Sequence, residues 1–188
     1  MTKTNSILKW ILSILLIIVL TLISYLYTSG SFEKRASPKD TISYKVNDLT
    51  LEVFYNRPYK KGRDIFGGLV PYNTVWRTGA NEATTFSSSL PITINNKKLP
   101  KGLYTLWTIP NASSWEIIFN SKQYPWGVDD QMKPMRDSEF DVLTVEIPVT
   151  KIDQVIEQFT IGFDNLRNPL EMYLVWDDTR INIPIIPN

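Results

Sequence analysis

The sequence predicts an all-β fold, an antiparallel β-sandwich or jelly-roll-like barrel of about nine or ten strands, preceded by one N-terminal transmembrane helix. Apolar and polar residues alternate in short runs from residue 41 onward, which is the pattern of half-buried strands. Turn-forming pairs such as Asn47-Asp48 and Asn95-Asn96 separate these runs. One long apolar segment near the N-terminus predicts the helix. The pattern is compatible with both a sandwich and a closed barrel.

The apolar segment is long enough to cross a membrane. Residues 10–32 contain no charged side chain, and a spanning helix needs about 20 residues. We expect a short tail over residues 1–9, a transmembrane helix over 10–27 and a linker over 28–40. The alternative is a signal peptide, whose cleavage would release a secreted domain. The length of the apolar run favours the uncleaved anchor.

Charges flank this segment almost equally, with Lys3 and Lys9 before it and Lys34, Arg35 and Lys39 after it. A very short N-terminal tail followed by a large domain is typical of a signal anchor. We therefore expect a single-pass protein whose N-terminus is cytoplasmic and whose β-domain faces the periplasm or the exterior.

The β-domain is expected over residues 41–188. Its last strand has the clearest alternation: Ile181, Ile183 and Ile185 are expected to point inward, and Arg180 and Asn182 outward. The expected strands cover residues 41–46, 49–55, 84–88, 92–94, 103–109, 115–120, 142–149, 159–164, 170–176 and 180–186.

One segment departs from the strand pattern. Ile152, Val155 and Ile156 have the spacing of one helix face, which predicts a helical turn or two between strands.

Composition excludes several kinds of chemistry. The chain has no cysteine and no histidine, so thiol nucleophiles, disulfides, imidazole bases and histidine-ligated metals are excluded. Its 20 basic and 19 acidic side chains nearly cancel, whereas nucleic-acid binding requires many cationic contacts to phosphate. We expect no nucleic-acid partner, no cofactor and no metal. The acidic side chains of one polar loop are interpreted as solvated charges rather than a metal site; they are Asp129, Asp130, Asp137, Glu139 and Asp141.

No hydrophobic period holds over residues 55–86, which we call the 55–86 loop. The loop follows one predicted strand and precedes another, and it is rich in glycine, proline, arginine and aromatic residues. A long connection inside a compact domain is usually functional or disordered, and this one contains too many large apolar residues to be disordered. The candidate ligand-binding residues are Arg57, Arg63, Trp76, Arg77, Asn81, Glu82 and, from a later segment, Trp126.

Each of these candidates has a structural alternative. The arginines, with Glu82, could bind an anionic or polyol ligand through fork-shaped hydrogen bonds, or they could satisfy one another and the carbonyl groups of the loop. Trp76 and Trp126 lie outside the predicted strands, where they could form a platform for sugar rings or pack in the core and at its rim. Glu82 is expected to be structural, paired with Arg77, although with a second carboxylate it would resemble a glycosidase pair.

Several short motifs carry a family resemblance. They are YNRP at 55–58, GRDIFGG at 62–68, WRTGANEATT at 76–85, LPKGLY at 99–104 and WG at 126–127. Over roughly residues 41–186 the chain resembles the bacterial family known as domain of unknown function 2911. The resemblance implies an all-β domain of bacterial envelope or secreted proteins, and it implies no activity.

Together these observations predict a membrane-anchored envelope domain that binds a small polar or saccharide-like ligand. A structural or protein-interaction module of the envelope, without a small-molecule site, is the first alternative. A carboxylate-based hydrolase is the second, and we assign no catalytic residues.

Overall fold

A computed structural model describes residues 3–28, 35–166 and 169–187, with side chains from residue 7 onward. The chain forms two compact units, residues 1–35 and 36–188. In the first unit, helix α1 (Lys3–Thr28) contains an apolar stretch, Ile7–Thr28, that is long enough to cross a membrane. Its 22 residues extend about 33 Å at about 1.5 Å per residue, against a hydrocarbon core of about 30 Å. A signal sequence would meet the same criterion.

The second unit is built on one antiparallel sheet, so the predicted all-β fold is confirmed. In the described residues nine strands follow the order β1-β2-β3-β6-β7-β8-β9-β4-β5. The sheet is not closed into a barrel, because β1 and β5 are its two unjoined edges, and the domain is therefore sandwich-like. The strands are β1 (Lys39–Val46), β2 (Leu49–Asn56), β3 (Thr85–Ser88), β4 (Ile92–Ile94), β5 (Lys97–Leu99), β6 (Gly102–Pro110), β7 (Ser114–Asn120), β8 (Asp141–Asp164) and β9 (Leu170–Pro187).

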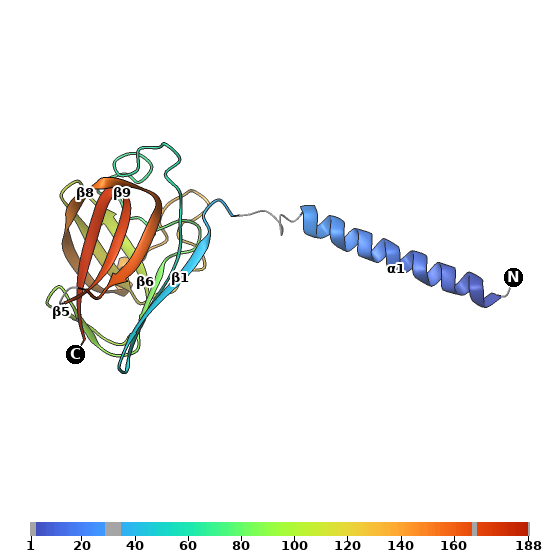
Figure 1. Cartoon of the computed structure of the whole chain (residues 1–188), viewed down its shortest axis with the longest axis horizontal. Helices are drawn as coiled ribbons and strands as arrows, with labels where there is room; N and C mark the ends of the chain where they lie inside the picture. The colour runs from blue at the N-terminus through green and yellow to red at the C-terminus, as the bar shows by residue number, and fades with distance from the viewer. Residues whose placement is uncertain (1–2, 29–34, 167–168, 188) are drawn as a thin grey trace. The chain divides into compact units, whose positions relative to one another are not determined.

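The long strand β8 joins the two layers of the sandwich. Its first part, from Asp141 to Pro148, pairs with β7, and its later part, from Val149 to Asp164, pairs with β9. The register with β9 shifts twice, on both sides of Ile156. In Figure 1 this hairpin, drawn in orange and red, curves around one side of the domain.

This corner corrects the prediction of a helical turn. Ile152, Val155 and Ile156 lie within β8, where the register shifts break the period of two and leave Val155 exposed. The predicted strands 142–149 and 159–164 are accordingly one strand, and the predicted strands 170–176 and 180–186 both belong to β9. Strand β5, which pairs with β4, was not predicted.

The core lies between the two layers. Ile181, Ile183 and Ile185 are completely buried while Arg180 and Asn182 are partly exposed, so the predicted alternation is confirmed. All residues of the core, including its partly buried members, lie between residues 42 and 185. None of the described residues of α1 belongs to this core, so we expect residues 36–188 to fold without the helix.

Tyr55 links the two layers. Its hydroxyl donates to the Ile161 carbonyl at 3.2 Å and accepts from the Ile161 amide at 3.1 Å, and its ring makes an edge-to-face contact with Phe159. Burial of the hydroxyl raises the pKa of Tyr55 to about 12. The end of β2 is thereby fixed against β8 where the 55–86 loop begins; residues 55–56 and 85–86 of that range belong to the ends of β2 and β3.

Candidate functional site

The 55–86 loop closes one end of the sandwich core. Ile65 and Val70 are buried in the core, and Phe66 and Trp76 pack against it. The amide of Phe159 in β8 donates to the Pro58 carbonyl at 2.9 Å, which fixes the start of the loop. The loop is therefore an ordered, packed part of the domain.

Trp76 is held by backbone pairing. Strand β3 pairs with only the first part of β6, and further along the same edge Trp76 and Thr108 exchange two backbone hydrogen bonds of 2.7 and 3.0 Å. The indole Nε1 donates to the Gly79 carbonyl at 3.0 Å. Around the ring stand four other aromatic side chains: Phe66, Trp115, Phe159 and Trp176.

The turn after Trp76 has an unusual backbone. Thr78, with φ of 54°, and Asn81, with φ of 57°, are in the left-handed region, which costs of the order of 1–3 kcal/mol for a β-branched residue such as threonine. Thr78 is completely buried, and its carbonyl accepts from the Thr84 hydroxyl at 2.8 Å. A Cβ at Gly79 would stand 2.9 Å from the Asn56 carbonyl oxygen. The turn is pressed against the end of β2, which fixes the positions of its side chains.

Arg77 is the half-buried charge of this turn. Its Nε is buried without a hydrogen-bond partner, and its guanidinium forms no ion pair with any residue that the structure describes. Burial lowers the pKa of Arg77. The interaction with Glu82 that the sequence predicted is absent from the described part of the chain. The guanidinium therefore stands without a counter-charge from the described residues.

A second loop, residues 121–140 between β7 and β8, covers the stem of Arg77. A Cβ at Gly127 would lie only 2.2 Å from Cδ of Arg77 and 2.6 Å from its Cβ, so only a glycine allows this approach. The Gly127 amide donates to the Asn81 carbonyl at 3.1 Å. Asn120 holds the base of this loop, since its Nδ2 donates to the carboxylate of Asp141 at 2.8 Å.

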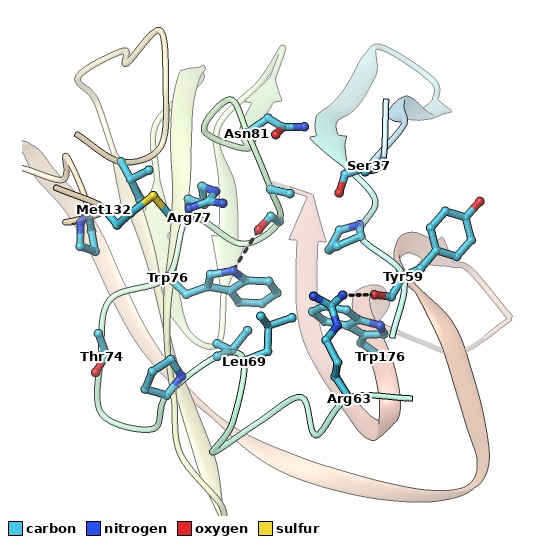
Figure 2. A pocket seen from close by; sticks show the side chains of 18 of the residues that line it. Ser37, Tyr59, Arg63, Leu69, Thr74, Trp76, Arg77, Asn81, Met132 and Trp176 are labelled. Carbon is cyan, nitrogen blue, oxygen red and sulfur yellow. Dashed lines mark hydrogen bonds between the residues drawn. The ribbon is translucent and has the colours of Figure 1, made fainter. Parts of the chain in front are cut away.

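These segments enclose a pocket of about 530 Å³. Figure 2 shows Arg77, Trp76 and Leu69 along one wall and Arg63 across from them. Trp176, whose ring stacks with that of Trp76 at 6.2 Å between centroids, lies between the two sides. The charged side chains that line the pocket are Lys61, Arg63 and Arg77, and the lining contains no acidic residue among those that the structure describes. The other lining residues are Ala36, Ser37, Pro58, Tyr59, Val70, Pro71, Thr74, Val75, Gly79, Ala80, Asn81, Val128, Met132 and Pro134.

Four of the seven predicted residues come together at this pocket: Arg63, Trp76, Arg77 and Asn81. Arg63 is exposed, and its Nε and Nη2 donate to the carbonyls of Lys60 and Tyr59. Arg63 is thus partly satisfied by the loop, as the structural alternative predicted, whereas Arg77 is not.

Arg57 lies outside the pocket and connects three strands. Its guanidinium contacts the Asp40 carboxylate at 3.2 Å, donates to the Phe159 carbonyl at 3.2 Å and donates to the Thr160 hydroxyl at 2.8 Å. These contacts bridge β1 and β2 to the later part of β8. Arg57 therefore has a structural explanation.

Glu82 also has structural partners. It pairs with Lys39 at 2.8 Å and accepts from Nδ2 of the completely buried Asn56 at 3.0 Å. It joins the start of β1 to the end of β2 and does not line the pocket. The structural role expected for Glu82 agrees with these contacts, but the partner expected for it, Arg77, was wrong.

The five tryptophans of the β-domain occupy three kinds of position. Trp107, Trp115 and Trp176 are at most 1% exposed, as core packing predicts. Trp126 is 42% exposed but does not line the pocket. Trp76 is half-buried and contributes to both the core cluster and the pocket wall.

The acidic residues in and next to the second loop have hydrogen-bond and ion-pair partners within the protein. Asp129 accepts from the amides of Gln131 and Lys133 at 2.9 Å each, and Asp141 pairs with Arg136. Hydrogen bonding to the Glu139 amide and to Lys122 lowers the pKa of the partly exposed Asp137. These carboxylates shape the loop that reaches Arg77.

Sequence reasoning missed most of the apolar lining. Val128, Met132 and Pro134 come from the second loop, and Ala36 and Ser37 come from the segment predicted to be a linker. These residue types carry no chemical signal by themselves. The nearest thing to a signal in the second loop is Gly127, a residue type that permits close approach, which lies at the contact with Arg77.

Fold and site define a sandwich-like all-β domain with a cation-lined pocket at one end of its core, on a chain that begins with an apolar helix. Residues 37–185 match the family described as "Protein of unknown function (DUF2911)", and the chain belongs to this family, which confirms the resemblance seen in the sequence. No curated protein and no solved structure matches the chain.

Proposed function

We propose that the β-domain is a binding module for a small organic anion, which occupies the pocket beside Arg77. The observation that carries this proposal is the half-buried guanidinium whose Nε lacks a partner. A desolvated charge is costly unless it is paired. An anionic ligand would supply the counter-charge that the described residues do not provide.

The pocket lining supports an anion over a neutral saccharide. Sugar hydroxyls donate hydrogen bonds, and carboxylates are the strong acceptors for them, but no described lining residue is acidic. Lys61, Arg63 and Arg77 instead offer donors and positive charge. Of the ligands that the sequence suggested, the anionic one therefore fits this site better.

The size of the pocket supports a small molecule. Its volume of about 530 Å³ lies within the range of about 300–1,000 Å³ that is typical of ligand sites.

The first alternative is a structural module, and one observation favours it. Ile65 and Val70 are buried in the core, so the 55–86 loop has a packing role whether or not a ligand binds. Packing explains those two residues, but it leaves the charge of Arg77 without an explanation. The hydrolase alternative has less support, because Glu82 is paired with Lys39 away from the pocket.

Thermal unfolding of residues 36–188 tests the proposal. A panel of small organic anions, with neutral analogues at the same ionic strength, should include compounds that raise the midpoint, since a ligand at 100 times its Kd adds about 2.7 kcal/mol of stability. Arg77→Met should abolish the shift, and Lys98→Gln, at an exposed lysine of β5, should not. The proposal fails if no anion shifts the midpoint or if Arg77→Met keeps the shift.

We place this domain outside the cytoplasm, tethered by α1. The support for this proposal is the length and apolar character of Ile7–Thr28. In a bacterial host, the full chain should remain in the membrane fraction after a high-salt wash, and protease added to spheroplasts should digest the β-domain. Release of a soluble form would contradict the anchor, and full protection from protease would contradict the orientation.

A further inference from the structure

The charge of the pocket interior indicates which class of organic anion fits the pocket. Arg77 is the half-buried cation of the lining, whereas Lys61 and Arg63 are exposed and therefore hydrated. The interior therefore offers one positive charge for compensation. A phosphate monoester carries about −1.5 to −2 at pH 7, which exceeds that charge, whereas a carboxylate carries −1.

The available donors agree with a carboxylate. None of the five N–H donors of the Arg77 guanidinium has a partner among the described residues. The Nε atom is, in addition, buried. A guanidinium edge and a carboxylate are both planar, so they form two parallel hydrogen bonds. Arg63 has less to offer, because its Nε and Nη2 already donate to backbone carbonyls.

The rest of the wall is apolar and partly aromatic. Next to Arg77 stands the half-buried indole of Trp76, and beyond it Leu69 is 45% exposed although it is a large aliphatic side chain. Met132, from the second loop, is also exposed and also lines the pocket. In Figure 2 this surface continues from Arg77 toward Leu69. A ligand that binds here presents an apolar body along with its anionic group.

We infer that the ligand is an amphipathic monocarboxylate, with its carboxylate on Arg77 and a ring or other apolar body against Trp76 and Leu69. This inference rests on the proposed function, because it names the class of anion that the same pocket binds. The body covers the exposed apolar wall, and the carboxylate neutralises the one interior charge. Apolar burial and a charge-assisted hydrogen bond then act on the same small molecule.

Calorimetric titration of the full chain in nanodiscs of zwitterionic lipid tests the inference. The probes are benzoate, naphthoate, naphthalenecarboxamide, naphthyl phosphate and acetate. The affinity for benzoate or naphthoate should be at least about ten times higher than the affinity for naphthalenecarboxamide, naphthyl phosphate or acetate. Arg77→Met should remove that preference over the carboxamide, and Lys98→Gln should preserve it.

A second substitution tests the position of the apolar body without changing the core. Leu69 is partly exposed, so Leu69→Asp and Leu69→Asn should both fold. Leu69→Asp places a negative charge beside the ligand and should weaken aryl carboxylate binding about tenfold more than Leu69→Asn does. Equal affinities for the two variants would contradict the assigned position.

The outcomes separate this inference from the function on which it rests. If naphthyl phosphate binds most tightly and requires Arg77, the pocket is an anion site but the carboxylate assignment is wrong. If acetate binds as tightly as the aryl carboxylates, the apolar body has no role. If no probe binds, or if Arg77→Met binds them all as the wild type does, the inference and the proposed function both fail.

Discussion

Gly127→Ala is the substitution that tests the geometry of the pocket wall most sharply. The added Cβ would stand 2.2 Å from Cδ, 2.9 Å from Cγ and 2.6 Å from Cβ of Arg77. Carbon atoms pack at about 3.5–4.0 Å, so the loop or the arginine must move by about 1.3 Å or more. The contacts involve the base of the arginine stem, which cannot swing away as its tip can.

Overpacking of this size costs about 1–3 kcal/mol. For a domain of 150–250 residues, each kcal/mol lowers the unfolding midpoint by roughly 2–4 °C, so Gly127→Ala should lower it by about 2–12 °C. Circular dichroism of residues 36–188 during heating measures the shift. Gly102→Ala is the matched control, because its Cβ would meet only the tip of Tyr104 at 3.2 Å, and it should change the midpoint little.

The same experiment in an Arg77→Ala background identifies the cause. Truncation of Arg77 to alanine removes Cγ and Cδ, so Gly127→Ala should destabilise the Arg77→Ala variant less than it destabilises the wild type. The coupling free energy of this double-mutant cycle should be at least about 0.5 kcal/mol. An unchanged midpoint for Gly127→Ala, or an equal loss in both backgrounds, would refute the packing of the second loop on Arg77.

Three further predictions concern the framework of the site. Glu82→Ala should cost about 1–3 kcal/mol because the buried amide of Asn56 loses its acceptor, and Glu82→Gln should cost less; equal urea midpoints for the two variants would argue against this contact. Ile183→Asp strands a charge in the core and should cost about 3 kcal/mol or more, while Asn182→Asp should cost little, and similar losses would mean that the strand register is wrong. Burial raises the pKa of Tyr55 to about 12, so the unfolded chain loses this proton first and stability should fall as pH rises from about 10 to about 12. Tyr55→Phe should flatten that decline in a pH series of urea unfolding, and an unchanged slope would contradict it.

The sequence predicted those strands in which apolar residues alternate regularly with polar ones, because one face of the strand packs on the core and the other does not. In β9 one face meets the core and the other does not, so Ile181, Ile183 and Ile185 reveal the strand directly. At the corner of β8 the register shifts on both sides of Ile156, and a strand that changes layer shows no period of two. The spacing of Ile152, Val155 and Ile156 then resembled that of a helix.

The candidate site was predicted in part, because some of its residues can be recognised from local composition alone. The composition of the 55–86 loop identified Arg63, Trp76, Arg77 and Asn81, which line the pocket. Pairing could not be predicted, because two of the partners of Glu82, Lys39 and Asn56, lie 43 and 26 positions away along the chain. The lining contributed by the second loop depends on tertiary packing and has no local sequence signal.

Arg77 has no counter-charge among the residues that the structure describes, and ligand-free unfolding of Arg77→Met tests this most directly. Methionine retains much of the apolar stem that packs against Gly127 but removes the desolvated charge. If the counter-charge of Arg77 comes from a bound anion, the free energy of unfolding of the unliganded variant should equal or exceed that of the unliganded wild type. The measurement is urea unfolding of residues 36–188 in a buffer of weakly binding ions. A loss of about 3–5 kcal/mol, as expected when one partner of a buried ion pair is removed, would show that Arg77 is paired within the protein and would contradict the account.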